Sequence, residues 1–291
     1  MTTPPQRTRA VAVAWVIAAY ITALVAAYFT WTRVPGSVLE RTAAADVVAT
    51  AVVFIYSRIF DNSSFYDPYW SVKPMVLTAH FWLLPESDGG VFARQLIITL
   101  LAWAYGVRLT HNWLRGWTGL DHEDWRYVDL RRKSGKAFFV VDLLGIHMFP
   151  TVQVFLGCLA AYLAMRSPVP LGPLDALGAV VTGGAILLQG TADNQLRAFV
   201  LSKPEPGTIL KTGLWARSRH PNYLGEMMLW WGLALFALGT DPQWWGFVGA
   251  ATITVMFVVV SVPMIDKRSL ERRPGYAEHM KRVPTFIPRP W

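Results

Sequence analysis

The chain has 291 residues, of which 53% are hydrophobic and only 16% are charged. A soluble domain carries about 25% charged residues, and the mean hydropathy of this chain is positive, at +0.32. The composition therefore excludes an ordinary soluble globular protein. A net charge of +8 also occurs in proteins that bind nucleic acids, so the positions of the basic residues decide what the charge means.

Apolar runs that are each about long enough to cross a bilayer, roughly 18 residues, follow one another along the chain. They comprise residues 10–31, 42–60, 92–109, 137–165, 171–190, 223–238 and 244–265. A shorter apolar stretch at 72–84 is typical of a short or re-entrant span. We therefore expect an all-α polytopic integral membrane protein with about seven or eight transmembrane helices. These helices would form a single membrane domain over residues 1–291.

The basic residues gather in three polar segments, at 108–136, at 193–220 and after residue 265. If eight helices span the membrane, these segments lie on one side together with the N-terminus. Loops rich in Lys and Arg stay in the cytoplasm, so we expect cytoplasmic loops and a cytoplasmic C-terminus. The basic charge then reflects membrane topology. The expected partner is the lipid bilayer, and no nucleic acid is expected.

Polar residues crowd the end of the second run, in the sequence FDNSSFYDPYWSVKP at 60–74. The Asp67–Pro68 pair favours a turn, so this segment is expected to fold back at the membrane surface. From a partly buried site, Tyr66 or Asp67 can donate a proton. The alternative is an aromatic belt with ordinary turn residues, and the residues alone leave both interpretations open.

Several acids lie within apolar runs or at their ends, namely Asp46, Asp142, Asp175 and Asp193. Ionisable residues inside a membrane are costly and indicate a functional role or a specific partner. His147 follows Asp142 by five residues, which is too far round an α-helix for a good pair. We therefore expect the two to face a polar cavity, or His147 to hydrogen-bond to a neighbouring helix.

No metal site is predicted. The single cysteine, Cys158, lies inside an apolar run and is expected to be buried. The adjacent residues His122, Glu123 and Asp124 have metal-binding side chains. Adjacent residues do not share a helix face, however, and no second His cluster completes a ligand set. A solvated loop is the favoured interpretation.

The stretch TGLWARSRHPNYLGEMMLWW, at 212–231, places strongly polar residues where an apolar helix begins. Two prolines and a glycine predict a turn at 203–207 before it. Pro221 is typical of the first position of a helix. With Arg217, Arg219 and His220 beside it, that helix start is predicted to bind an anion, best a phosphate group.

One turn deeper, Asn222 and Glu226 are four residues apart and share a helix face. A carboxylate one turn inside a membrane helix favours a functional site. The alternative is a cationic membrane flank in which Glu226 pairs with Arg219 or with a neighbouring helix.

Three motifs together resemble a known group of membrane enzymes. GLWARSRHPNYLGE, the upstream DNQLRAF and the closing RRPGYAEHMKRVPTFIP are similar to the C-terminal half of the steroid 5-alpha-reductase-like and sterol reductase membrane proteins. With DNSSFYDPYWS included, the chain looks most like a bacterial branch of this clan that is defined as a domain of unknown function. The resemblance covers residues 61–291, with 193–291 as the cofactor-binding half, and implies a multi-pass protein of the bacterial inner membrane.

In those reductases NADPH lies in a pocket of the last spans, the cytoplasmic loops and the tail, and its hydride reduces a C=C bond. The resemblance implies the same cofactor here, with a lipophilic small-molecule substrate that is steroid-, sterol- or isoprenoid-like. It implies that Glu226 approaches the nicotinamide as a catalytic residue. It also implies cofactor contacts at Asp193, Trp215, Asn222, Tyr223, Asp266, Arg272, Tyr276 and His279. On the basis of charge, we add Arg197, Lys203 and Lys211 as contacts to the 2′-phosphate and pyrophosphate.

Two departures from the family pattern limit what is carried over. The Gln-Glu pair that polarises the substrate of the 5-alpha-reductases is absent, so steroid specificity is not implied. Tyr66 and Asp67 are our substitutes as the catalytic proton donors. Leu196 and Val200 stand where sterol reductases carry the Lys and Arg of QKxxFR, so the phosphate contacts must differ.

Two alternatives to the reductase remain. The RHPNY motif is shared with isoprenylcysteine carboxyl methyltransferases and phospholipid methyltransferases, which use S-adenosylmethionine. Those enzymes tend to carry paired glutamates after the last span, whereas this chain has Asp266–Lys267 there, which favours the reductase. The other alternative is a non-enzymatic lipid-binding membrane protein.

Overall fold

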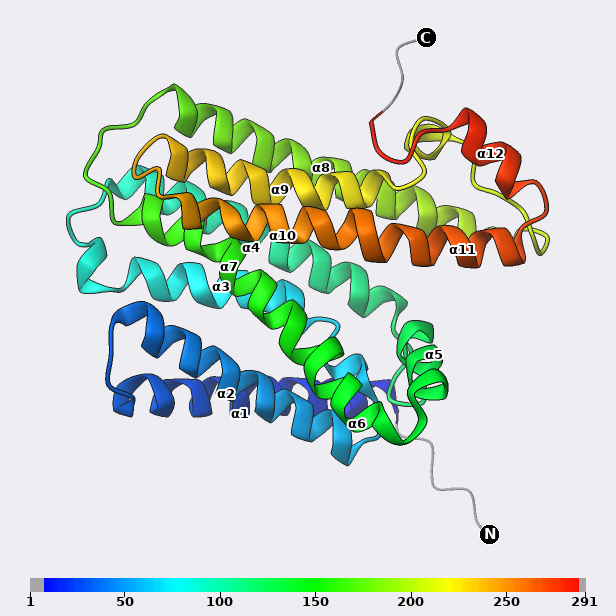
Figure 1. Ribbon diagram of the computed structural model, residues 1–291, viewed down its shortest axis with the longest axis horizontal. Coiled ribbons are helices and arrows are strands. Elements are labelled where there is room, and N and C mark those ends of the chain that lie inside the picture. The colour runs from blue at the N-terminus through cyan, green and yellow to red at the C-terminus, as the bar shows by residue number, and fades with distance from the viewer. Residues whose placement is uncertain (1–7, 288–291) are drawn as a thin grey trace. The chain divides into compact units, whose positions relative to one another are not determined.

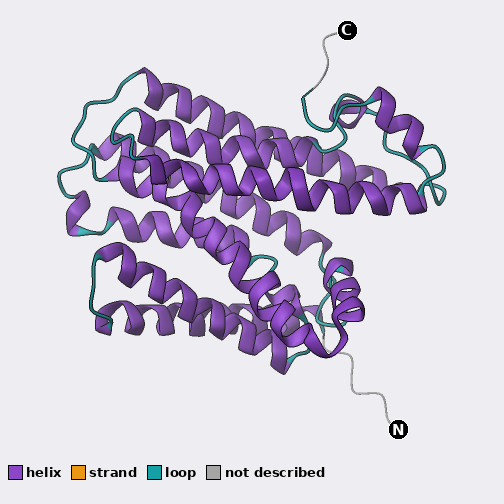
Figure 2. Cartoon of the chain, in the orientation of Figure 1, coloured by secondary structure: helices purple, strands orange, loops and turns teal. Residues whose placement is uncertain are grey.

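The computed structural model describes residues 8–287, and in that range it contains helices and no strand (Figures 1 and 2). The longer helices are α1 (Arg9–Arg33), α2 (Val38–Ile59), α3 (Tyr69–Trp82), α4 (Phe92–Gly116), α7 (Phe149–Met165), α8 (Pro173–Leu201), α9 (Pro221–Leu238) and α11 (Val262–Arg272). The shorter ones are α5 (Trp125–Ser134), α6 (Phe138–Val140), α10 (Val248–Met256) and α12 (Tyr276–Arg282). Two π-helical segments, η4 (Val141–Met148) and η7 (Phe257–Ser261), join α6 to α7 and α10 to α11. The all-α prediction is confirmed.

Four helical stretches of the described residues are long and apolar enough to cross a membrane. They are Arg9–Arg33, Trp125–Met165, Pro173–Leu201 and Trp244–Arg272. The other predicted spans lie in α2, α3, α4 and α9. Of these, α3 has only 14 residues, fewer than the roughly 20 that a bilayer requires. The larger number of spans stays a prediction.

Local sequence explains where key helices begin and end. Ser37 and Glu40 form a capping box at the start of α2, which satisfies two free backbone N–H groups. The fixed φ of Pro221 starts α9, as predicted. The predicted turn at 203–207 is confirmed by the end of α8 and by the positive φ of 88° at Gly207.

The chain divides into two compact units. The first comprises Met1–Val76 and Gly106–Phe155, and the second comprises Leu77–Tyr105 and Leu156–Trp291. Each unit is described by itself below.

In the first unit, a buried lysine of α3 connects α2 to α7. The buried Lys73 ammonium donates to Asp46 Oδ2 at 2.7 Å and to the carbonyl oxygen of Thr151 at 2.7 Å. Burial of both charges requires such pairing, because an isolated charge in an apolar interior is very costly. Asp46 therefore has a structural partner that the sequence did not suggest.

The expectation that Asp142 and His147 are badly placed to pair was wrong. The segment that holds them is π-helical, so its hydrogen bonds connect residues five apart. His147 Nδ1 consequently lies 3.2 Å from Asp142 Oδ1, and His147 Nε2 lies 2.9 Å from Ser57 Oγ of α2. The predicted bond of His147 to a neighbouring helix is confirmed.

In the second unit, glycines let the helices approach closely. Gly225 and Gly232 of α9 pack against α8, where a methyl group at Gly232 would lie 2.8 Å from the backbone nitrogen of Thr182. A methyl group at Gly249 of α10 would overlap the backbone of Gly157 in α7. Small residues at helix contacts are the usual means of close packing in membrane proteins.

A buried ion pair also lies in the second unit. The guanidinium of Arg94, on α4, donates from Nε to Asp175 Oδ1 at 2.6 Å and from Nη2 to Asp175 Oδ2 at 2.9 Å. Such a bidentate pair fixes the orientation of both side chains, and here it ties α4 to the start of α8. Asp175 is thus explained by a structural partner. The prediction that Cys158 is buried is also confirmed.

Replacing Gly249 with alanine should destabilise the second unit. The added methyl group meets backbone atoms of Gly157, which cannot rotate away, and overpacking of this kind costs about 1–3 kcal/mol. Gly184→Ala in α8 is the matched control, because nothing lies within 4 Å of its added methyl group. Thermal unfolding in detergent should show a lower Tm for Gly249→Ala alone. Equal Tm values for the two variants would contradict the close packing.

Candidate functional site

One carboxylate of α11 collects three donors, two of which come from the residues just before α9. Asp266 of α11 is 6% exposed. Its Oδ1 accepts from Tyr276 Oη at 2.8 Å and from His220 Nε2 at 3.0 Å. Its Oδ2 accepts from Arg219 Nη2 at 2.9 Å. Four predicted cofactor-binding residues are therefore brought into one hydrogen-bonded cluster, which we call the Asp266 network (Arg219, His220, Asp266 and Tyr276).

The Asp266 network also fixes the C-terminal tail. Arg219 Nη1 donates to the carbonyl oxygen of Val283 at 3.0 Å, and Nη2 donates to Thr285 Oγ1 at 3.0 Å. The backbone N–H of Arg219 donates to the carbonyl oxygen of Pro284 at 2.9 Å. The tail thus lies against the residues that precede α9. Most of the hydrogen-bonding capacity of Arg219 is used within the protein.

Burial and the neighbouring carboxylate act together on Tyr276. Burial raises the pKa of its hydroxyl to about 12, and the hydrogen bond to Asp266 acts in the same direction. The hydroxyl therefore stays neutral over the physiological pH range and donates a hydrogen bond to Asp266.

Aromatic rings extend the network along α9. The His220 and Tyr223 rings are stacked with centroids 5.7 Å apart and an interplanar angle of 10°. Tyr223 also packs against Phe257 at 4.6 Å. Ahead of α9, the Trp215 indole donates to the carbonyl oxygen of Ala192 at 3.0 Å. Flat aromatic surfaces next to polar groups are typical of sites that bind ring-containing ligands.

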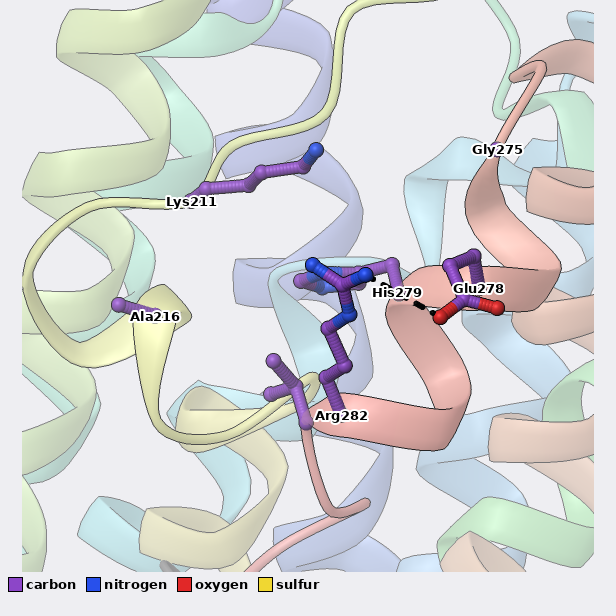
Figure 3. A pocket seen from close by; sticks show the side chains of 7 residues that line it. Lys211, Ala216, Gly275, Glu278, His279 and Arg282 are labelled. Carbon is purple, nitrogen blue, oxygen red and sulfur yellow. Dashed lines mark ion pairs between the residues drawn. The ribbon is translucent and has the colours of Figure 1, made fainter.

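A small cavity lies beside the Asp266 network (Figure 3). Its volume is about 180 Å³, and it is lined by Lys211, Ala216, Gly275, Glu278, His279, Arg282 and Val283. Burial lowers the pKa of His279, and the positive charges of Lys211, Arg219 and Arg273 lower it further. Positive potential therefore prevails at the cavity wall.

Glu226 lies deeper in the second unit and holds three helices together. Its Oε1 accepts from Tyr105 Oη of α4 at 2.7 Å and from Trp230 Nε1 of α9 at 3.1 Å. Its Oε2 accepts from Gln189 Nε2 of α8 at 2.6 Å. Glu226 is 6% exposed. Of the alternatives considered from sequence, pairing with neighbouring helices is confirmed, whereas Arg219 pairs with Asp266.

The remaining predicted cofactor residues are more scattered. Asn222 is half-buried in the first turn of α9, and its Oδ1 accepts from the backbone N–H of Tyr223 at 3.1 Å. Asp193 and Arg197 are half-buried on α8, and three basic residues are exposed, namely Lys203, Lys211 and Arg272. Their contacts with a cofactor stay predictions.

Tyr66 and Asp67, the predicted proton donors, belong to the first unit. Tyr66 is 2% exposed, and its hydroxyl lies 2.8 Å from Thr151 Oγ1. Burial raises the pKa of Tyr66 well above its ordinary value, so its hydroxyl is neutral. Asp67 Oδ1 accepts from Tyr127 Oη at 2.7 Å, and burial raises the pKa of Asp67 to about 6. Both are thus protonated under mildly acidic conditions.

The loop that contains His122, Glu123 and Asp124 forms hydrogen bonds with the residues just before Tyr66 and Asp67. The Glu123 carboxylate accepts from the backbone N–H of Ser63 at 2.8 Å, and the backbone N–H of Asp124 donates to Ser64 Oγ at 2.9 Å. Asn62 Nδ2 donates to the carbonyl oxygen of His122 at 3.0 Å. Among the residues of known placement, no group of three or more His, Cys, Asp or Glu side chains could hold a metal ion.

The stability of the first unit should depend on the protonation of Asp67. Its pKa is about 6 in the folded protein, against about 3.9 in an unfolded chain. The contribution of Asp67 is therefore fully present below about pH 4 and is lost as the pH rises through about 6. We expect Asp67→Asn to remove this dependence and to raise the Tm at pH 8 relative to the wild type. Parallel Tm–pH curves for the two proteins would contradict the raised pKa.

Sequence reasoning missed the partners that complete these clusters. Trp230 follows Glu226 by four residues, so the helical repeat was sufficient to find it. Tyr105 and Gln189 come from other helices, and only their polarity inside apolar runs marked them. Glu278 and Arg282 of the cavity lie one turn apart on α12.

Comparison with known proteins places these features in a family. The family model described as "Protein of unknown function (DUF1295)" matches residues 53–283. An uncharacterized protein of Schizosaccharomyces pombe is 25% identical over 258 residues, which cover 78% of this chain and 73% of that protein. A Delta(14)-sterol reductase of Ascobolus immersus is 28% identical over 163 residues.

The sterol reductase match covers 48% of this chain and 38% of the reductase. No solved structure matches the chain. Both relatives are fungal, so a bacterial origin stays a prediction. Because the family model matches well over half of the residues, the chain belongs to the DUF1295 family, which is part of the steroid 5-alpha-reductase-like clan.

Proposed function

We propose that the chain is an NADPH-dependent membrane reductase that reduces a C=C bond in a lipophilic substrate of steroid, sterol or isoprenoid type. The observation that carries the proposal is the Asp266 network. It joins two segments that are far apart in sequence at the end of an apolar helix, next to aromatic rings and a cationic cavity. The similarity to a sterol reductase supports the reaction class.

The residues of the second unit fit parts of this cofactor. The cavity of about 180 Å³ is smaller than the roughly 300–1,000 Å³ of whole ligand pockets, so it fits one phosphate group and not a dinucleotide. Trp215, His220 and Tyr223 offer flat surfaces for rings, and Asn222 offers an amide. Arg197, Lys203 and Arg272 offer positive charge for phosphates. When bound, NADPH would supply the hydride.

The protein's own residues supply positioning and a proton. Asp266 holds Arg219, His220 and Tyr276 in fixed orientations, so they need not reorganise when a cofactor binds. We propose that Tyr66 or Asp67 holds the proton that the reduced carbon skeleton requires. A carboxyl group with a pKa of about 6 is suited to proton transfer near neutral pH.

Ligand-induced thermal stabilisation tests the proposal. Purified protein in mild detergent should gain Tm with NADPH and show no gain with S-adenosylmethionine, since binding to the folded state alone raises stability. Asn222→Ala should reduce the NADPH effect, whereas Asn194→Ala, an exposed asparagine on α8, should leave it unchanged. Stabilisation by S-adenosylmethionine would favour a methyltransferase. A response to neither ligand would favour a lipid-binding protein.

A further inference from the structure

The cavity of the second unit carries an unbalanced set of charges. Lys211 reaches towards it from the loop ahead of α9, while Glu278, His279 and Arg282 come from α12 (Figure 3). Lys211 has no ion-pair partner among residues 8–287. The single carboxylate of the lining, Glu278, faces two cations and an imidazole. The lining therefore favours an anion.

The carboxylate of Glu278 is held only by weak ion pairs. Its Oε1 lies 3.3 Å from Arg282 Nη2, and its Oε2 lies 3.3 Å from Lys281 Nζ. These pairs are solvent-exposed, with 54% of the Glu278 side chain accessible, and exposed ion pairs contribute little to stability. An anion that binds more strongly can therefore displace Glu278 from Arg282 at little cost in free energy.

The potential at the cavity wall supports this interpretation. Beyond burial, three cations lower the pKa of His279, and the opposing influence of Asp266 is smaller than that of each of them. A dianion in the cavity would reverse this effect and favour the protonated ring.

The volume of the cavity restricts the ligand. About 180 Å³ corresponds to about six water molecules at ~30 Å³ each. This space accommodates a terminal phosphate group with a few waters. An Arg and a Lys together are suited to phosphate, since the guanidinium binds two oxygens and the ammonium adds a point charge.

We propose that Lys211, His279 and Arg282 bind the dianion of a phosphate monoester, and that this phosphate displaces Glu278 from its ion pair with Arg282. The proposal of a phosphate site depends only on the residues that line the cavity. Its assignment to the 2′-phosphate of NADPH rests on the proposed function. The headgroup of phosphatidic acid presents the same chemical group.

Calorimetric titration of the full-length protein in detergent tests the site with adenosine 2′,5′-bisphosphate and with adenosine, which carries no phosphate group. The bisphosphate should bind at least about tenfold more tightly, because it adds charge-assisted bonds. Lys211→Ala and Arg282→Ala should each remove most of that preference, whereas Glu278→Gln should strengthen bisphosphate binding about threefold or more by removing the competing charge. Lys267→Ala, an exposed lysine of α11 outside the cavity, should change neither ligand.

Each outcome separates the phosphate site from the proposed function. Equal binding of the bisphosphate and adenosine, unaffected by the four variants, would overturn the assignment to the 2′-phosphate, while NADPH stabilisation would still support a reductase. A second titration uses micelles containing phosphatidic acid, with phosphatidylcholine as the control. Binding of phosphatidic acid that depends on Lys211 and Arg282, without nucleotide binding, would support the phosphate site and overturn the NADPH assignment. Failure of both phosphate probes would overturn the site itself.

Discussion

Replacing Asp266 with asparagine is expected to destabilise the second unit by about 3–5 kcal/mol and to abolish nucleotide binding. The substitution leaves the Arg219 guanidinium, which is 9% exposed, without a counter-charge. Removing one partner of a buried ion pair carries a cost of this size. The hydrogen bonds from His220 and Tyr276 weaken as well, because a neutral amide is a poorer acceptor than a carboxylate.

The control for this prediction is another Asp–Arg pair of the second unit. Arg166 Nη2 lies 2.8 Å from Asp241 Oδ2, with 37% of the arginine and 26% of the aspartate side chain exposed. Asp241→Asn should therefore cost only about 0–1 kcal/mol. Tm in detergent and limited proteolysis of the tail measure the difference. If both variants lose the same Tm and the tail stays resistant in Asp266→Asn, the network does not hold the tail.

The second large effect is expected at Glu226. Glu226→Gln replaces one carboxylate oxygen by an NH2 group, so a donor then faces the donors of Tyr105, Gln189 or Trp230. A buried polar group that loses its partner costs about 1–3 kcal/mol. A clear drop in Tm is therefore expected from this change of a single atom.

A reciprocal exchange tests whether this cost arises from hydrogen bonding. In the double variant Glu226→Gln with Gln189→Glu, the amide can donate to the new carboxylate while its oxygen accepts from Tyr105 and Trp230. The Tm should then recover most of the loss, as coupled neighbours do in a double-mutant cycle. Additive losses in the double variant would contradict the three-helix contact. If the wild type has the proposed reductase activity, its loss in a stable double variant would support a catalytic role for the carboxylate at position 226.

The sequence predicted features that depend on local chemistry. Pro221 begins α9 because its ring fixes φ and it lacks an N–H that a first helical residue does not need. Gly207 ends the predicted turn because a positive φ suits glycine. The apolar runs predicted helices, although by length and composition four stretches in the described range qualify as spans.

Features that depend on tertiary contacts were harder to predict. His147 reaches Asp142 only because the helix there is π-helical, and the i,i+4 rule assumes an α-helix. Arg219 was predicted beside an anion, and the structure supplies one from within the protein, at Asp266. That pairing depends on the path of α11 and the tail, which no local pattern of residues encodes.

Direct titration of NADPH tests the central claim of a dinucleotide site in the second unit. Purified protein is titrated with NADPH while energy transfer from tryptophan to the reduced nicotinamide is measured, with Trp215 as a nearby donor. Saturable binding is predicted in the wild type and in Asp241→Asn, and no saturable binding is predicted in Asp266→Asn. Absence of saturable NADPH binding to the folded wild-type protein, or equal binding to Asp266→Asn, would contradict the account.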